Sequence, residues 1–533
     1  MPVRRLVLAL TLVLVTTACS TAVPSGPDGA PTTTADPDLG ATFTAALATE
    51  PDTLNPLLGY APHGDGTIFE GLVGLGPDLR PRPVLATDLP EVSEDGLVYT
   101  FTLRDGVTFH DGEPMDAVDV VFTYTEATRP GLESPVASTL AALDRVEATD
   151  GRTVVFHLDY PYAPFLVSTT LGIVPEHLLD GEDLTDTAFN REPVGTGPYA
   201  VESWRSGEQL VLTAHEGHRD GPADVGRAVF LFVGDDATRA ARVAAGDVDA
   251  AVLPPPLLPR FEGDEGWQVH RVDTADFRAV ALPAHDNPVT SDPVLRRALG
   301  HAVDRQAMVD AVLAGAGRPA YSPVPPEHPA YQPGSELEHD PGLARRLLDE
   351  AGWATGPDGV RERDGVRARF TLMYPAQDTL RQGLALAFQS AAAEVGVQVD
   401  LEGLSWEAIQ PRMRTDAVVF GQGSPYDPDL TLYSQFHSSL AYQGFENPGG
   451  YSSEEVDRLL EEGRRVRDEA DRAGIYQQVQ ELLARDQPWV FLAFVDHGYV
   501  LREGWGGYEP VVEPHEHGLN GGPWWDLTAL SAP

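Results

Sequence analysis

The chain contains no lysine. All 37 of its basic residues are arginine, and they stand against 81 aspartate and glutamate residues, so the formal net charge is -44. A phosphate-binding GxxxxGK loop, a Schiff-base enzyme and an SxxK serine hydrolase all need a lysine side chain. The sequence therefore excludes P-loop ATPases and these two classes of enzyme.

Cysteine is almost as scarce, because Cys19 is the only one in 533 residues. A single thiol cannot form an intrachain disulfide, and no second one remains for a cysteine-ligated metal site. Apolar runs are short as well. The run 6–15 has about half of the ~20 residues that a membrane-spanning helix needs, and no later segment is long and apolar enough.

The acidic charge argues against two classes of partner. A net charge of -44 repels nucleic acid phosphates and anionic lipid headgroups. We interpret it as a solvated acidic surface that keeps the protein soluble and monomeric; attraction of cationic ligands is the alternative. The length of 533 residues, 42% of them hydrophobic, is enough for sizeable cores and about three domain-sized units.

The N-terminus has the features of an export signal. Arg4 and Arg5 precede the apolar run, and small residues lead to Ala18 and Cys19, which is the order of a secretory signal with its cleavage site. Residues 15–19 (VTTAC) resemble a bacterial lipobox, although Thr16 stands where an aliphatic residue is usual. We expect acylation of Cys19 after removal of a signal at 1–19, followed by a flexible tether at 20–40. The alternative is an ordinary secreted protein with a leftover thiol.

Strand patterns are frequent in the first half of the chain. Apolar and polar residues alternate over 99–103, continue at 107–109 after an Asp-Gly turn, and alternate again over 154–158. Helical patterns with capping residues are frequent from about residue 290. Their spacing predicts helices over 292–315, 340–352 and 380–396. A fourth helix is predicted to begin with a capping box of Ser452 and Glu455, and a fifth is predicted around 475–483. Alternating strands and helices in two large blocks predict an α/β fold.

Several segments, in the same order along the chain, match one known family. They are 50–56 (EPDTLNP), 68–73 (IFEGLV), 99–112 (YTFTLRDGVTFHDG), 117–123 (AVDVVFT), 194–199 (VGTGPY), 295–306 (LRRALGHAVDRQ), 347–353 (LLDEAGW) and 450–460 (GYSSEEVDRLL). Together they resemble the family 5 extracellular solute-binding proteins of peptide and nickel ABC importers. The similarity implies that 68–73 forms the first helix.

This resemblance implies a two-lobe, type II periplasmic-binding-protein-like fold with an extra subdomain in the first lobe. The chain would cross between the lobes near 275–283 and 488–494. The expected bounds are 41–275 for the first lobe with its subdomain, 276–488 for the second lobe and 489–533 for the return to the first. A hinge between the lobes would close on the ligand, because the closed state makes ligand contacts that the open state lacks.

The resemblance also implies a binding loop at 421–429. Dipeptide-binding members use an aspartate in this loop to pair with the α-amino group of the peptide. Alignment on Asp427-Pro428 places Ser424 where those members have the aspartate. Asp427 or Asp429 would therefore have to pair with the α-amino group instead. Tyr426 matches a tyrosine of the nickel-binding members. A rigid proline turn without ligand contact is the alternative.

We therefore predict that the second-lobe loop contributes Gly423, Ser424, Tyr426 and Asp427 to ligand binding, and that Tyr60 and Tyr374 provide apolar walls. Trp406 is a further aromatic candidate for which core packing is expected. The histidines of 215–218 and 515–517 could chelate a metal, but their polar sequence surroundings favour solvated loop histidines. We expect no metal site, cofactor or catalytic residue.

The expected function is that of a receptor, outside the cell membrane, which captures a peptide or a similar amphipathic solute and delivers it to ABC permease subunits, with the ATPase on a separate chain. A receptor for a nickel or other metal chelate is the alternative within the same class. A secreted acidic hydrolase, such as a glycosidase, is the alternative from another class, but acidic pairs occur by chance among 81 carboxylates.

Overall fold

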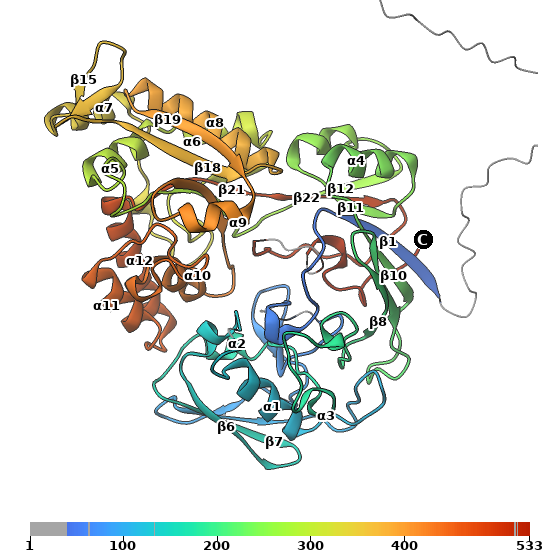
Figure 1. The fold of residues 1–533 in the computed structure, drawn as a ribbon. Coiled ribbons are helices and arrows are strands. Elements are labelled where there is room, and N and C mark those ends of the chain that lie inside the picture. Colours follow the sequence, from blue (N-terminus) through green and yellow to red (C-terminus); the bar gives the residue numbers. More distant parts are fainter. Residues whose placement is uncertain (1–39, 62–63, 65, 133, 516–518, 520) are drawn as a thin grey trace, which may run out of the picture.

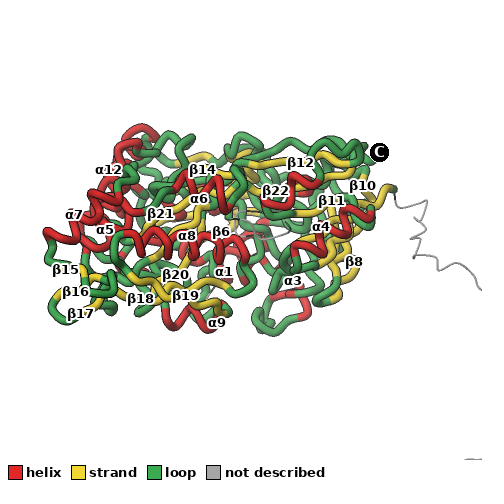
Figure 2. Tube along the Cα trace, turned by 90° about the horizontal axis from the view of Figure 1, so that it is seen from above, coloured by secondary structure: helices red, strands yellow, loops and turns green. Residues whose placement is uncertain are grey.

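The computed structural model describes residues 40–61, 64, 66–132, 134–515, 519 and 521–533. The predicted signal, the lipidation site Cys19 and the tether up to residue 39 lie outside the described residues. Figure 1 shows two lobes, with a smaller body of teal strands and helices beside the first. In both views, α7 (Pro341–Glu350) and β15 (Ala354–Thr355) lie at one end of the molecule, and β8 (Tyr199–Arg205) and β10 (Val225–Phe232) at the other (Figures 1 and 2).

The first lobe is built on a seven-stranded sheet of order β12-β22-β11-β1-β10-β9-β8. The strand β1 (Ala41–Leu47) runs parallel to its neighbours β10 and β11 (Ala250–Val252), and the other pairs are antiparallel. The remaining members are β9 (Gln209–Ala214), β12 (Trp267–Val272) and β22 (His497–Arg502), with helix α4 (Asp236–Ala245) packed against β11. Strand β22 comes from the end of the chain, so the first lobe is discontinuous in sequence.

A four-stranded antiparallel sheet, β4-β5-β7-β6, forms the core of a subdomain of the first lobe. Its strands β5 (Val98–Thr102) and β7 (Thr153–Leu158) confirm the alternation seen in the sequence, since their buried apolar residues belong to the same core as those of α1 (Ala117–Ala127). The other elements here are β2 (Val73–Leu75), β3 (Pro81–Pro83), β4 (Glu91–Val92), β6 (Leu143–Asp150), α2 (Phe165–Ser168) and α3 (Glu176–Leu179).

The second lobe has a six-stranded mixed sheet of order β14-β21-β13-β20-β18-β19. Its strands are β13 (Phe277–Ala281), β14 (Gly317–Pro319), β18 (Arg369–Pro375), β19 (Gln398–Leu404), β20 (Ala417–Gln422) and β21 (Trp489–Val495). One face packs on α5 (Pro293–Ala302), α7 and α8 (Thr379–Glu394), and the other on α10 (Pro428–Phe436), α11 (Glu454–Gly463) and α12 (Glu469–Asp486). Helices thus cover both faces of a sheet that is largely apolar, which confirms the predicted α/β class.

Smaller elements complete this lobe: α6 (Arg305–Val312), α9 (Trp406–Ile409), and a minor sheet of β15, β16 (Arg361–Arg363) and β17 (Val366–Arg367). Among the described residues, none of the helices has the length and apolar character that crossing a bilayer requires.

The two large sheets are joined by the chain at two places. The first connection runs from β12 to β13 through residues 273–276, and the second from β21 to β22 through Asp496. The expected bounds place residues from 489 onward in the first lobe. Strand β21 instead pairs with β13 and β14 of the second sheet, so the second crossing comes at Asp496.

Three local predictions are wrong. The helix expected over 68–73 is absent: residues 68–72 are irregular and Val73 begins β2. This segment lies against residues 195–199, where Gly197 and Tyr199 donate backbone hydrogen bonds to Ile68 and Thr67 at 3.0 Å each. The helix expected over 292–315 is two helices, α5 and α6, because Asp304 caps a new helix by accepting from the backbone of Ala307. The helix expected to begin at Ser452 is capped by Ser453 instead.

Candidate functional site

The carboxyl ends of three neighbouring strands in the second lobe lie at the same edge of its sheet. Strands β19 and β20 both run parallel to β18, which lies between them. Asp378 follows β18, Trp406 follows β19, and the loop 423–427 follows β20. Open α/β sheets bind ligands at the carboxyl ends of their strands. Strand β13, which is antiparallel to β20, begins at this edge directly after the first crossing, so the edge faces the junction of the lobes.

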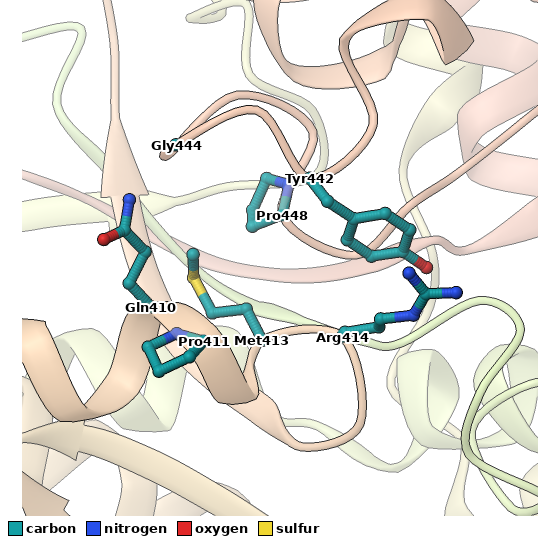
Figure 3. A pocket seen from close by; sticks show the side chains of 7 residues that line it. All are labelled: Gln410, Pro411, Met413, Arg414, Tyr442, Gly444 and Pro448. Atoms are coloured by element: carbon teal, nitrogen blue, oxygen red, sulfur yellow. The ribbon is translucent and has the colours of Figure 1, made fainter.

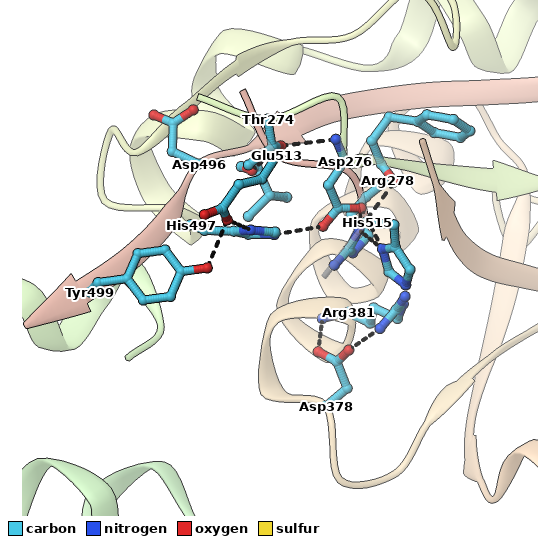
Figure 4. Close-up of polar contacts among 12 residues, drawn as sticks. Thr274, Asp276, Arg278, Asp378, Arg381, Asp496, His497, Tyr499, Glu513 and His515 are labelled. Carbon is cyan, nitrogen blue, oxygen red and sulfur yellow. Dashed lines mark hydrogen bonds and ion pairs between the residues drawn. The ribbon is translucent and has the colours of Figure 1, made fainter. Parts of the chain in front are cut away.

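A buried cluster of charged side chains occupies this junction (Figure 4). Its centre is Asp276, a fully buried residue of the first crossing. Its carboxylate is paired with Arg278, with His515 at 2.7 Å and with His497 at 3.3 Å. Burial alone would raise the pKa of Asp276, but Arg278 and the two histidines hold it well below its usual range. Asp276 is therefore an anion that binds groups from several segments together.

His497 extends the cluster into the first lobe. It is the first residue of β22 and contacts Glu513 at 2.7 Å as well as Asp276, while the hydroxyl of Tyr499 donates to the same Glu513 carboxylate at 2.7 Å. Burial would lower the pKa of His497, but the two carboxylates raise it to about 10. A charged His497 thus links both crossings to the C-terminal segment.

Arg278 and Arg381 lie on the second-lobe side of this cluster. Each residue is only 8% exposed. Arg278 Nη1 contacts Asp276, the Phe277 carbonyl at 3.2 Å and His515 at 3.4 Å, whereas Arg381 pairs with Asp378. Burial, and then the neighbouring charge of Arg278, lower the pKa of Arg381. The two guanidinium groups are therefore near enough to repel each other in a desolvated place.

Aromatic residues adjoin the arginines. The guanidinium of Arg381 lies 5.6 Å from the ring centroid of Trp406, and the Trp406 ring contacts Phe445 and Phe420 at 5.4 and 6.2 Å. Phe445 is 42% exposed. Trp406, expected to pack in the core, is half-buried and forms one cluster with the core residue Phe420 and the exposed Phe445, whose rings also stack on each other. The second lobe thus presents an apolar wall beside two cations.

The predicted binding loop lies at the same junction. Gly423 has a φ of 154°, and a Cβ there would come 1.9 Å from the Ala275 carbonyl oxygen of the first crossing. Its own carbonyl accepts a hydrogen bond of 3.0 Å from the backbone of His515. Tyr426 is half-buried, and burial followed by the charge of Glu513 raises its pKa. The loop therefore touches the crossing and the C-terminal segment of the first lobe.

Ser424 faces a small hollow of the second lobe. Its backbone donates to the Thr431 hydroxyl at 3.2 Å, and its own hydroxyl accepts from the backbone of Tyr426 at 3.4 Å. The hollow holds about 10 Å³ and is also lined by His328 and Pro428, which is room for about one water molecule. In this arrangement the hydrogen bonds of Ser424 are made to residues of the second lobe itself.

The acidic residues that could replace an aspartate at position 424 are already paired. Asp427 caps α10 by accepting from the Asp429 backbone, and both of its oxygens bind Arg472 at 2.6 Å. Asp429 is 1% exposed and binds Arg464 at 2.8 Å and the Tyr476 hydroxyl at 3.1 Å. Because these carboxylates are committed to arginines of the same lobe, the Asp427 and Asp429 side chains hold α10 in place rather than offering a free anion.

The two predicted wall tyrosines pack within their own lobes. Tyr60 is 6% exposed and belongs to the main core of the first lobe. Tyr374 is half-buried against α8, and its hydroxyl accepts a hydrogen bond of 3.2 Å from Gln382. The ring of Tyr374 also lies against Gly403, where an added Cβ would meet it at 3.2 Å.

Direct contacts hold the lobes together on the far side of the site. The backbone of Ala163 in the first lobe donates to the Arg464 carbonyl at 2.8 Å, and Arg467 donates to the Glu94 carbonyl at 3.2 Å. The Tyr162 hydroxyl reaches Asp429 at 3.4 Å. The described structure is thus a closed arrangement of the two lobes.

A separate hollow of about 260 Å³ lies in the second lobe (Figure 3). Two segments line it, with Gln410, Pro411, Met413 and Arg414 from one and Tyr442, Gly444 and Pro448 from the other. All of these lining residues belong to the second lobe, and none is a predicted binding residue.

The interpretation of the two histidine motifs as solvated loops is wrong for the described residues. His218 has a side chain only 8% exposed that lies 3.5 Å from Glu70, which also binds Arg219 at 2.6 Å. His515 is bound to Asp276 as described above, and residues 516–518 lie outside the described residues. Pairing with buried carboxylates draws these imidazoles inward, which a polar local sequence does not reveal.

Sequence reasoning missed Asp276, Arg278 and Arg381. A usable signal was present for one of them, since Arg278 interrupts the apolar run of β13 (FRAVA). A charged residue in a strand that is buried on both faces needs a partner or a function.

Comparison with known proteins agrees with this architecture. The model of bacterial extracellular solute-binding proteins, family 5 Middle, matches residues 80–443. The chain is 45% identical over 513 residues to Protein XP55 of Streptomyces lividans, covering 96% of this chain and 93% of the relative. It is 28% identical over 477 residues to the oligopeptide-binding protein AppA of Bacillus subtilis, covering 86% of each.

Solved structures give the same result. NikZ of Campylobacter jejuni, in complex with Ni(L-His), superposes with a TM-score of 0.85 at 29% identity, covering 92% of this chain and 99% of that one. AppA in complex with a nonapeptide superposes with a TM-score of 0.81 at 25% identity, covering 93% and 99%. The chain therefore belongs to the family 5 extracellular solute-binding proteins.

Proposed function

We propose that this chain is the solute-binding receptor of an ABC importer and that it captures a peptide or a similar amphipathic solute between its two lobes. The observation that carries the proposal is the site at the junction. Arg278 and the loop 423–427 come from the second lobe, whereas His515 and Glu513 come from the C-terminal segment that packs with the first. Groups from both lobes that face one another at the junction are what capture by hinge closure requires.

The carboxyl groups paired with Arg278 and Arg381 do not resemble the general acid of a glycosidase. A glycosidase general acid must hold its proton near neutral pH, which needs a raised pKa. The carboxyl groups of Asp276 and Asp378 behave in the opposite way: burial would raise their pKa, but Arg278 and Arg381 lower it. The pKa of Asp496, in the second crossing, is raised to about 6 by burial. The Asp276 and Asp378 anions serve to hold cations in place.

A receptor for a nickel or other metal chelate is the second candidate, because the NikZ structure that superposes on this chain contains Ni(L-His). The imidazole of His515 lies at the junction, although its Nδ1 is engaged by Asp276. Under either reading we propose that Cys19 carries a lipid anchor on the outer face of the membrane, that the receptor is a monomer, and that the permease and ATPase are separate chains.

Native mass spectrometry of the receptor, purified from its own host without denaturation, tests this proposal. We expect a fraction with one bound solute whose fragmentation spectrum shows a peptide. A bound solute that contains nickel would favour the second candidate. Conversion of an added peptide or oligosaccharide into smaller products by the purified protein would refute the receptor assignment.

A further inference from the structure

The loop that connects α11 to α12 in the second lobe contacts the subdomain of the first lobe. Two of its guanidinium groups lie over tyrosine rings of the segment that leads into α2. Arg465 lies 4.9 Å from the ring centroid of Tyr160, and Arg464 lies 5.0 Å from that of Tyr162. The backbone of Ala163 donates a hydrogen bond of 2.8 Å to the Arg464 carbonyl. These contacts join segments that are far apart in the sequence and belong to different lobes.

Arg467, at the end of the same loop, adds a second point of contact. Its Nη1 donates to the Glu94 carbonyl at 3.2 Å, and a Cβ at Gly96 would come 3.1 Å from its Cδ. The turn between β4 and β5 therefore lies directly against the loop. We refer to residues 94–96 and 160–163 of the first lobe, together with 464–467 of the second, as the clasp.

The second lobe holds its half of the clasp in place. The guanidinium of Arg464 binds Asp429 at 2.8 Å and lies 3.4 Å from the ring centroid of Tyr433, and its side chain is only 6% exposed. Helix α12 begins just after the loop, with Asp468 as its cap. Arg465 is exposed, so its side chain can be replaced without disturbing the core of the lobe.

The clasp lies away from the two crossings. In Figure 1, α11 and α2 are on the opposite side of the view from β21 and β22, which flank the second crossing. Because the chain joins the two large sheets at the crossings, opening of a hinge there separates the two halves of the clasp. The protein makes these contacts with itself, so they stabilise the closed arrangement with or without a solute.

The net charge of the lobes opposes closure, and the clasp counteracts it. Both lobes carry more acidic than basic residues, so they repel each other as they approach. At the clasp, however, the second lobe presents three arginines to two tyrosine rings and a backbone carbonyl of the first. A cation–π contact at an exposed site favours the arrangement that contains it by about two- to fivefold.

We propose that the clasp holds part of the receptor population closed before a solute binds, and that Tyr160 and Arg465 act as positioning residues that raise the affinity for the captured solute. The inference rests on the proposed capture between two lobes. A receptor whose binding-competent state is only partly populated binds more weakly by that fraction. Loss of a clasp contact should therefore weaken capture although it removes no contact with the solute.

Distance measurements without solute test the clasp. Spin labels at Val118→Cys and Leu386→Cys, both about half exposed, are read by pulsed electron resonance in a Cys19→Ser background. Any solute that copurifies is first removed by unfolding, dialysis and refolding. We expect two distances in this parent protein. The ratio of closed to open populations should be about two- to fivefold lower in Arg465→Gln and in Tyr160→Leu, which keeps an apolar side chain against the core.

A double-mutant cycle separates the contact from other effects of the substitutions. The double variant should lower the ratio no further than either single variant does, because both substitutions remove the same interaction. Arg458→Gln, which breaks an exposed ion pair with Glu462 within α11, is the matched control and should keep the ratio of the parent. Urea unfolding checks that each variant is folded.

The possible outcomes are distinct. If the single variants keep the ratio of the parent, if their effects add in full, or if the parent shows only the longer distance, the clasp is wrong and the receptor function stands. If the parent shows only the shorter distance, the longer one should appear in both single variants, and its absence refutes the clasp. Failure of the receptor function itself appears in the separate mass-spectrometry experiment, as conversion of a solute into smaller products.

Discussion

Replacing Gly423 by alanine should destabilise the second lobe by at least about 3 kcal/mol. The residue has a φ of 154°, which L-amino acids rarely adopt, and strain of this kind costs about 1–3 kcal/mol. The new Cβ would also lie 1.9 Å from the Ala275 carbonyl oxygen, whereas ordinary contacts are 3.4–4 Å. The neighbouring atom is backbone of the first crossing, so it cannot move aside as the end of a side chain could.

A second glycine separates strain from the steric clash. Gly106 has a φ of 72°, and nothing lies within 4 Å of the Cβ position there, so Gly106→Ala should cost only about 1–2 kcal/mol. Urea unfolding followed by tryptophan fluorescence gives both free energies of unfolding. Equal losses in the two variants would refute the assignment of Gly423 to close contact with the crossing.

Three further predictions concern pH, salt and anchoring. Burial lowers the pKa of His110 from 6.5 to about 4, so the fold should lose about 3 kcal/mol of stability as pH falls from 6.5 to 4. The free energies of unfolding of wild type and His110→Gln, measured by urea titration, should differ by an amount that changes over this pH range. A constant difference would contradict the prediction. With a net charge of -44, the melting temperature should rise when salt is added to a low-salt buffer; a flat or falling curve counts against self-repulsion. Cys19→Ala should release the protein into the medium or leave it unprocessed, and a mature, membrane-bound variant would exclude the lipid anchor.

Local patterns predicted those elements whose side chains pack close by in sequence. Strands β5 and β7 pair with each other, and β7 contacts α1 of the same subdomain, so alternation was sufficient. Helices α7 and α8 carry their own caps, Asp340 and Asp378. The segment 68–73 was misjudged because its partner, around Gly195 and Gly197, is more than a hundred residues away.

The sequence led to one part of the junction and not to the rest. The loop 423–427 was predicted from the resemblance to the family, and its role in ligand binding stays a prediction; the structure places it at the edge where the carboxyl ends of β18, β19 and β20 gather. The cluster around Asp276 joins residues from the crossings, α8 and the C-terminal segment, and no spacing in the sequence records such a meeting. The sequence also did not reveal that Asp427, at the start of α10, is bound to Arg472 of α12.

Closure of the two lobes around a solute is the central claim, and a distance measurement tests it most directly. Spin labels at Val118→Cys on α1 and Leu386→Cys on α8, both about half exposed, can be introduced in a Cys19→Ser background and read by pulsed electron resonance. We predict a broad or double distance distribution without solute that narrows to the shorter distance when the solute recovered by mass spectrometry is added. A single distance that the solute leaves unchanged would contradict capture by closure.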